Sequence, residues 1–300
     1  MPSVRHQLLA TVIPKVRRSR ELESEPVERA RVEAWHRTLD RSLPTRAVPR
    51  LAKRWDVVVE DLGFPSYVLT PRGRRVTRTL YYVHGGGFMA PIDAFHVRYA
   101  TRLADAIGAR VVMPDYPLAP EHTWRDSHDA LVEDLARWSA GPGGVVLAGD
   151  SAGGGLALAL ALSVRDRGLA PATHLVLHAP WVDLTTSTAE ETRAADAIDP
   201  WLFLGKVEAY AGWWAGSPDD LGRPEVSPAL ADLSGLPRAL MLYGTRDLLA
   251  PGCRLLVRRA AEAGWDLTSV EEADLIHVYG LLPIAPEARR AFGQVVEFLR

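Results

Sequence analysis

Cysteine is almost absent from the chain. Cys253 is the single cysteine among 300 residues, which excludes an internal disulfide, so the sequence does not require an oxidising compartment. Long apolar runs are also absent. None reaches the ~20 residues that span a bilayer, and residues 8–13 are too few for the core of a signal peptide. We therefore expect a cytoplasmic protein with no stable membrane insertion.

Neither sign of charge dominates the whole chain. It has 35 Lys and Arg against 37 Asp and Glu, and the net charge of −2 gives no general reason to expect a nucleic-acid partner. Residues 1–54 differ, with 13 Lys and Arg against six Asp and Glu. Ser24 and Pro26 indicate a helix start there, and we interpret the segment as a helical cap over the rest of the chain. Its attraction to an anionic surface is a less favoured alternative.

From about residue 55 onward, short apolar runs alternate with helical segments. Such alternation is typical of a mostly parallel sheet with helices on both faces. The runs predict eight strands, at residues 56–60, 67–69, 79–83, 110–113, 145–148, 175–177, 239–242 and 267–270. Residues 186–226 contain no strand pattern, and we expect a helical insertion there.

Aromatic residues gather in this insertion, at Trp201, Phe203, Tyr210, Trp213 and Trp214. Three of them, Phe203, Tyr210 and Trp214, fall on one helical face, and such a stripe is more often core than pocket. A helix inserted over the carboxyl ends of the strands would nevertheless cover the place where ligands bind. Trp201, Phe203, Tyr210 and Trp214 are therefore candidates for a compact substrate pocket.

A serine stands where the strand at 145–148 turns into a helix rich in Ala and Leu. It is Ser151, with Gly149 two residues before it and Gly153 two residues after it. A direct strand-to-helix turn leaves no room for side chains beside the serine, and the G-x-S-x-G spacing meets that requirement. The helix amino terminus also directs N–H groups toward negative charge. By itself the motif leaves a nucleophile and an incidental serine equally open.

Consecutive glycines supply candidate donors for an oxyanion. Gly85, Gly86 and Gly87 come just after the strand at 79–83, where backbone N–H groups can face a ligand without a Cβ in the way. Gly85 and Gly86, together with Ala152 after the serine, are the predicted oxyanion hole. A flexible loop is the alternative, and it suits one glycine better than three.

A catalytic serine also needs an acid and a histidine, which follow it in that order after later strands. Asp247 follows the strand at 239–242 through a Gly-Thr-Arg turn, and His277 lies between the last strand and the last helix. No other histidine has this place and order. The competing acids are Asp266, Glu271, Glu272 and Asp274.

These motifs together resemble the hormone-sensitive-lipase-like (bacterial family IV) esterases of the α/β-hydrolase fold. They are HGGG at 84–87, PDYPLAPEH at 114–122, GDSAGG at 149–154, SPAL at 227–230, Asp247 and His277. The resemblance covers about residues 55–300. It implies a catalytic domain there, built on an eight-stranded, mostly parallel sheet flanked by helices. Residues 1–54 and the insertion at about 186–226 would form its helical cap.

The resemblance implies hydrolysis of a small-molecule carboxylic ester through an acyl-enzyme on Ser151, with no metal or organic cofactor. It also implies that a homodimer is common. Two departures, at Leu248 after the acid and at Val278 after His277, look closer to monoterpene lactone hydrolases and antibiotic-precursor acetyl hydrolases. Lactone opening, deacetylation and amide hydrolysis therefore stay open. A non-catalytic ligand receptor is less favoured, because all three triad residues are present.

One polar cluster contains residue types that bind metals. Its members are Glu121, His122, Asp126, His128 and Asp129. Their spacing matches no H-E-x-x-H pattern, so we expect structural or surface roles and no metal site.

Overall fold

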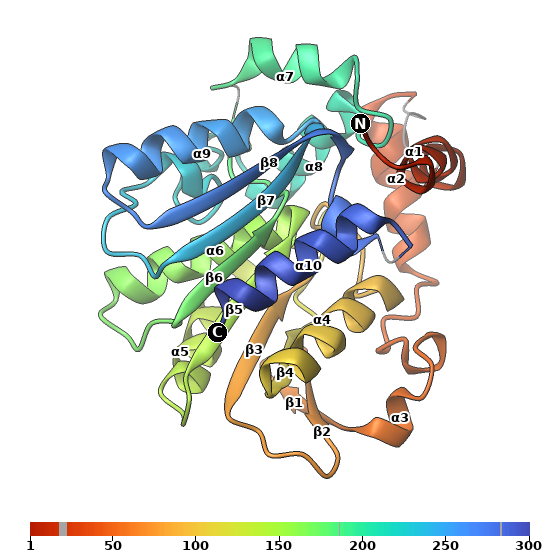
Figure 1. Ribbon diagram of the computed structural model, residues 1–300. Helices are drawn as coiled ribbons and strands as arrows, with labels where there is room; N and C mark the ends of the chain where they lie inside the picture. Colours follow the sequence, from red (N-terminus) through yellow and green to blue (C-terminus); the bar gives the residue numbers. More distant parts are fainter. Residues whose placement is uncertain (18–22, 186, 283) are drawn as a thin grey trace.

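The computed structural model of the protein describes residues 1–17, 23–185, 187–282 and 284–300. A twisted sheet crosses the molecule, with helices on both sides of it (Figure 1). Its eight strands lie in the order β1-β2-β4-β3-β5-β6-β7-β8. They are β1 (Trp55–Asp61), β2 (Pro65–Pro71), β3 (Arg78–Val83), β4 (Ala109–Pro114), β5 (Val145–Asp150), β6 (His174–His178), β7 (Ala239–Arg246) and β8 (Leu267–Ile276).

The predicted mostly parallel sheet is confirmed. β2 runs antiparallel to both β1 and β4, and the six strands β4-β3-β5-β6-β7-β8 run parallel to one another. All eight strands lie where the apolar runs predicted them. β7 extends further than expected, so Gly244, predicted in a turn, lies within the strand. A side chain at Gly244 would overlap the carbonyl oxygen of Leu275 on β8, which explains the glycine.

The described residues contain ten α-helices. They are α1 (Val4–Arg17), α2 (Glu25–His36), α3 (Leu51–Arg54), α4 (Ala94–Ile107), α5 (His128–Ser139), α6 (Ser151–Asp166), α7 (Ala189–Asp196), α8 (Leu204–Ala215), α9 (Ala250–Glu262) and α10 (Pro286–Phe298). Short 3-10 turns are η1 (Thr45–Ala47), η2 (Trp124–Asp126), η3 (Pro218–Asp220), η4 (Pro228–Leu230) and η5 (Tyr279–Leu281). α1 and α7 lie within the two segments expected to be helical, although no pattern located them, and Trp201 and Phe203 precede α8 instead of lying in it.

The inner strands are buried on both faces, with successive residues pointing to opposite sides of the sheet, whereas the edge strands β1 and β8 are largely exposed. On one side Tyr81 and Val83 of β3 belong to a core with α5, α6 and α9. On the other side Leu80 and Tyr82 belong to a core with α4 and α10. The helices therefore hold the sheet rigid and leave the carboxyl ends of the strands for side chains that do chemistry.

Two segments lie outside the strand–helix alternation and meet each other. The first ends where β1 begins, at Trp55, and the second lies between β6 and β7. Their contact joins α2 to α8: the Tyr210 hydroxyl donates to Glu28 and the Trp213 indole N–H donates to Glu25, both at 2.5 Å. That these segments act as one functional cap stays a prediction.

Candidate active site

Ser151 occupies the junction of β5 and α6. Its φ of 52° lies in the left-handed region, a strained conformation typical of a nucleophile elbow. The residue is mostly buried, with 9% of its surface exposed. A Cβ at Gly153 would overlap the carbonyl oxygens of Val83 and His84. The second glycine of the motif therefore lets α6 approach the end of β3 closely.

His277 and Asp247 lie beside this serine. They follow the neighbouring parallel strands β8 and β7, whose carboxyl ends meet at one edge of the sheet. Nε2 of His277 is 2.8 Å from Oγ of Ser151, and Nδ1 is 2.9 Å from Oδ2 of Asp247. A carboxylate can only accept, so Nδ1 carries the proton and Nε2 is left to accept from the serine hydroxyl. The three side chains therefore form a continuous hydrogen-bonded chain from the serine hydroxyl to the carboxylate.

The environment of His277 favours its charged form. Burial alone would lower the pKa of His277, but the charge and hydrogen bond of Asp247 oppose this. With further contributions from Asp199 and Asp150, the result is a pKa above the usual value. The imidazolium that forms when the histidine takes a proton is thereby stabilised.

The competing acids lie elsewhere. Glu271 pairs with Arg254, Glu272 pairs with Arg290, and Asp266 lies 4.0 Å from Arg238. The backbone N–H of Asp274 donates to the Thr245 hydroxyl. None of these contacts involves His277.

Asp199, from the insertion, is a site residue that the sequence did not reveal. Its Oδ2 accepts from the N–H of Leu248, the residue after Asp247, at 2.7 Å. Its Oδ1 accepts from the N–H groups of Trp201 and Leu202 at 2.6 and 3.0 Å. Burial and the nearby Asp247 raise the pKa of Asp199 to about 6. One buried carboxylate thus joins the insertion to the residues that follow Asp247, and no sequence motif indicated it.

In the glycine loop after β3 the N–H of Gly85 is engaged, whereas the N–H groups of Gly86 and Gly87 have no acceptor within the described residues. The N–H of Gly85 donates to Oδ1 of Asp150 at 3.2 Å, so the prediction of Gly85 as an oxyanion donor is wrong for this arrangement. Nδ1 of His84 holds the Gly85 carbonyl at 2.8 Å. That carbonyl and the Gly86 N–H belong to one planar peptide, so the N–H points the opposite way. Within the described residues the Gly86 N–H has no acceptor.

Ala152 is the second predicted donor. It lies in the first turn of α6, where N–H groups have no partner within the helix. The Gly86 and Ala152 N–H groups therefore come from two segments that flank Ser151. That these two N–H groups and the helix amino terminus would stabilise a negative charge developing near the serine stays a prediction.

Asp150 holds the back of this loop. It is 4% exposed and accepts from the Tyr82 hydroxyl at 2.7 Å as well as from Gly85. Nε2 of His96 lies 3.4 Å from its other oxygen. Burial alone would raise the pKa of Asp150, but His96 and Tyr82 bring it down to about 2. Asp150 therefore stays ionised in the working range of an enzyme.

The predicted pocket aromatics separate into two kinds. The Trp201 ring packs edge-on against the His277 ring at 5.5 Å, and the Tyr210 ring lies against Gly87. Trp214 is wrong as a pocket residue: it has no exposed surface and stacks on Phe88 at 4.3 Å. Phe203 stands just before α8 and is partly buried. A pocket role for Trp201, Phe203 and Tyr210 stays a prediction.

A cavity of about 550 Å³ lies between α7, α8 and the start of α9. The part of its lining that comes from α8 consists of Leu204, Val207 and Ala211. The segment after Asp247 adds Leu248 and Leu249. Ser151 and His277 are not among its lining residues. This cavity is therefore separate from the nucleophile and the histidine.

Members of the polar cluster considered for metal binding have separate partners, apart from His122 and Asp126, whose side chains lie 4.0 Å apart. Glu121 pairs with His36, the Asp126 side chain accepts from the backbone N–H of Thr123, and Asp129 pairs with Arg167. Within the described residues no group of three His, Cys, Asp or Glu side chains could hold a metal ion. In the same part of the chain, no helix combines the length and apolar character that a membrane crossing requires.

Comparison with known proteins places this geometry in a family. The profile of a family described as alpha/beta hydrolase fold matches residues 80–281. An acetyl-hydrolase of Streptomyces hygroscopicus is 34% identical over 235 residues, covering 76% of this chain and 77% of the relative. Esterase LipU of Mycobacterium tuberculosis is 30% identical over 280 residues, covering 86% and 89%.

Solved structures agree over nearly the whole chain. An esterase from the bacterial hormone-sensitive lipase (HSL) family matches with a TM-score of 0.79 and 27% identity, over 100% of this chain and 99% of its own. EstE5, soaked by p-nitrophenyl butyrate, matches with a TM-score of 0.81 and 26% identity over 99% and 98%. The chain therefore belongs to the α/β-hydrolase fold family, among the bacterial hormone-sensitive-lipase-like esterases that its motifs predicted.

Proposed function

We propose that the protein is a serine carboxylesterase that hydrolyses short-chain or compact carboxylic esters through an acyl-enzyme on Ser151. The observation that carries the proposal is the pair of hydrogen bonds linking Ser151 to His277 and His277 to Asp247. The esterase and acetyl-hydrolase names of the relatives support the same reaction class.

In the first half of the reaction, Nε2 of His277 takes the hydroxyl proton while Oγ of Ser151 bonds to the ester carbonyl carbon. The carbonyl electron pair moves onto oxygen, where the N–H groups of Gly86 and Ala152 stabilise it. The bond to the alcohol oxygen then breaks, and the alcohol leaves with the proton from His277. Water repeats these steps on the acyl-enzyme and releases the acid.

The substrate is expected to be compact. Trp201 and Tyr210, large rings close to His277 and the glycine loop, would limit the space around the reacting carbonyl. The names of two matches, acetyl-hydrolase and EstE5 soaked by p-nitrophenyl butyrate, contain short acyl groups. Lactone opening or deacetylation by the same triad is the second candidate, favoured by the residues that follow Asp247 and His277. A ligand-binding role without catalysis is opposed by the complete triad.

Residues 1–54 and about 186–226 are proposed to act as a cap over this site, supported by the contacts of α2 with α8. We also propose a cytoplasmic location, supported by the single buried Cys253. The family resemblance favours a homodimer, which light scattering of the purified protein would test.

Ser151→Ala tests the proposal. We expect it to lose nearly all hydrolysis of p-nitrophenyl acetate while its melting temperature stays close to that of the wild type. Ser163→Ala is a matched control on the same helix, because Ser163 also lies 2.7 Å from a histidine, His128, yet stands away from the triad. Wild-type turnover by Ser151→Ala would refute the proposal. A panel of lactones and acetylated amines would separate the candidate substrates.

A further inference from the structure

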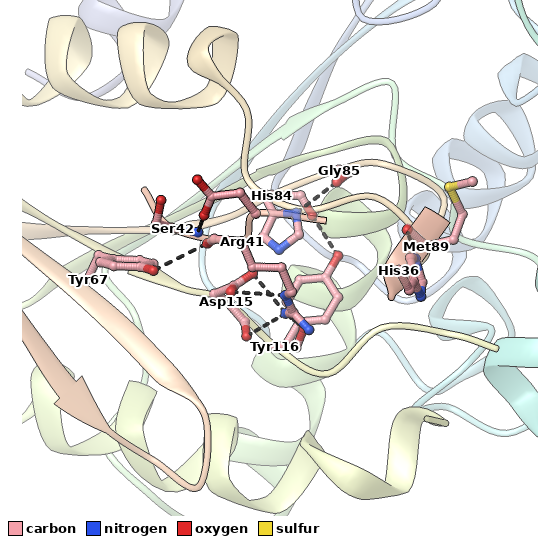
Figure 2. Close-up of polar contacts among 10 residues, drawn as sticks. His36, Arg41, Ser42, Tyr67, His84, Gly85, Met89, Asp115 and Tyr116 are labelled. Carbon is pink, nitrogen blue, oxygen red and sulfur yellow. Dashed lines mark hydrogen bonds and ion pairs between the residues drawn. The ribbon is translucent and has the colours of Figure 1, made fainter. Parts of the chain in front are cut away.

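Arg41, in the segment before β1, holds the buried turn that follows β4. Its Nη2 donates to Oδ1 of Asp115 at 2.9 Å and to the carbonyl oxygens of Asp115 and Tyr116 at 3.0 and 2.8 Å. Its Nε donates to Oδ2 of Asp115 at 3.2 Å. Figure 2 shows the guanidinium with these acceptors converging on it. Arg41 fixes both the side chain and the backbone of this turn.

Tyr116 passes this constraint to the glycine loop. Its hydroxyl donates to the His84 carbonyl at 2.8 Å, and its ring stacks on the His84 ring at 4.3 Å and 15° (Figure 2). The His84 carbonyl shares a peptide with the N–H of Gly85, which Asp150 holds at 3.2 Å. The peptide between His84 and Gly85 is therefore fixed at both ends.

His84 orients the next peptide. Burial lowers the pKa of His84 to about 3, with the nearby His96 adding to the effect, so its ring is neutral at working pH. The Gly85 carbonyl can only accept, so the ring proton is on Nδ1, which points at that carbonyl. Through the planar peptide this interaction determines where the Gly86 N–H points.

His36 contacts the outer end of the same loop. Its Nε2 lies 2.7 Å from the Met89 carbonyl and its Nδ1 lies 2.7 Å from Oε2 of Glu121. The N–H of Met89 in turn donates to the Gly86 carbonyl at 3.2 Å. Residues 36–41 therefore act on this loop in two ways, directly through the contact of His36 with Met89 and indirectly through the contacts of Arg41 with Asp115 and Tyr116 (Figure 2).

We propose that Arg41 is a positioning residue for the oxyanion loop, acting through Asp115, Tyr116 and His84 on the direction of the Gly86 N–H. This inference rests on the proposed function, because it requires Gly86 to stabilise the oxyanion. It gives the segment before β1 a part in the transition state, although none of its residues touches Ser151 in the described contacts.

Arg41→Ala and Tyr116→Phe test the inference in the full-length protein. Loss of one oxyanion donor costs about 10²–10³-fold in kcat. A misdirected donor should cost less, so we expect roughly a tenfold loss of kcat on p-nitrophenyl acetate with KM nearly unchanged. Affinity for a trifluoromethyl ketone, whose adduct with Ser151 carries an oxyanion, should fall by a similar factor. Arg41→Lys should recover only part of the loss, because an ammonium lacks the planar fork.

Arg54→Ala is the matched control. Arg54 belongs to the same segment and pairs with Asp105 of α4. Asp105 also pairs with Arg74 at 3.0 Å, and neither ion pair involves the glycine loop. Arg54→Ala should keep both kcat and inhibitor affinity. Arg41→Ala leaves the buried Asp115 without its charged partner, so this variant can fail to fold. In that case Tyr116→Phe, which removes only one hydroxyl, decides whether the positioning role holds.

The outcomes separate this inference from the proposed function. If Tyr116→Phe keeps wild-type kcat and inhibitor affinity while Ser151→Ala is inactive, the positioning role is refuted and the esterase proposal stands. The same holds if a folded Arg41→Ala loses only thermal stability. If Ser151→Ala itself keeps its activity, the proposed function fails and this inference fails with it.

Discussion

Gly86→Ala is the sharpest test of the oxyanion loop, because it keeps the backbone N–H and changes only where that group can point. Gly86 has a φ of 117°, a region that residues with a Cβ rarely adopt. A Cβ added there would meet the Ala90 carbonyl oxygen at 2.8 Å and the Ala90 Cβ at 2.9 Å. Both distances are shorter than ordinary contacts, so the loop has to move.

The size of the effect follows from two separate costs. Holding a non-glycine residue in a sparsely populated backbone region costs about 1–3 kcal/mol. In a chain of this size each kcal/mol corresponds to roughly 2 °C in melting temperature, so a loss of about 2–6 °C is expected. Movement of the loop also misdirects the Gly86 N–H, and loss of that donor would reduce kcat by about 10²–10³-fold.

Gly63→Ala separates the two costs. Gly63 lies in the turn between β1 and β2 with a φ of 86°, and an added Cβ there has no atom within 4 Å. We expect it to lose stability through backbone strain alone and to keep the wild-type kcat. Thermal melts and p-nitrophenyl acetate kinetics on both variants provide the comparison. If Gly86→Ala loses stability like Gly63→Ala but keeps its kcat, Gly86 does not hold the oxyanion.

Three further predictions concern the triad, its pH dependence and the substrate. Asp247→Asn and His277→Ala should each lose about 10³–10⁴-fold in kcat, and the double variant should lose little more, because the groups act as a unit; additive losses would contradict this. His277 must be neutral to act as a base, and Asp199 contributes to its raised pKa, so Asp199→Asn should move the acidic limb of kcat/KM to lower pH; an unmoved limb would exclude that contribution. Activity on p-nitrophenyl esters from acetate to palmitate should fall steeply with chain length, since each methylene gains ~0.8 kcal/mol only while room remains and overpacking costs ~1–3 kcal/mol; a maximum at palmitate would refute a compact pocket.

The strands and the order of the site residues could be predicted from sequence because both depend on local patterns. A buried parallel strand needs a short apolar run, and a strand-to-helix turn under a serine needs glycine at fixed spacing. Once the strands are parallel and adjacent, the residues after β7 and β8 must meet at one edge of the sheet. That is why Asp247 and His277 could be paired although 30 residues separate them.

The residues that the sequence did not reveal act over long distances without a local pattern. Arg41 is one of 13 cations in its segment, and its contact with Asp115 spans 74 residues. Asp199 reaches Leu248 across 49 residues from an insertion without a motif. For the aromatics, helical spacing indicated which residues share a face but not how deep each lies. Tyr210 ended beside the glycine loop, whereas Trp214, four residues later, ended in the core on Phe88.

The contacts of Asp150 explain why an acid stands between Gly149 and Ser151. A buried carboxylate is costly unless donors surround it, and here the Tyr82 hydroxyl, the Gly85 N–H and His96 do so. Its pKa of about 2 keeps the negative charge fixed while His277 titrates. That charge holds the Gly85 N–H, which leaves the next N–H, that of Gly86, as the proposed oxyanion donor, and it helps to raise the pKa of His277. One side chain therefore couples the nucleophile turn to a loop 65 residues earlier in the chain, so the serine and its proposed oxyanion donors are positioned together.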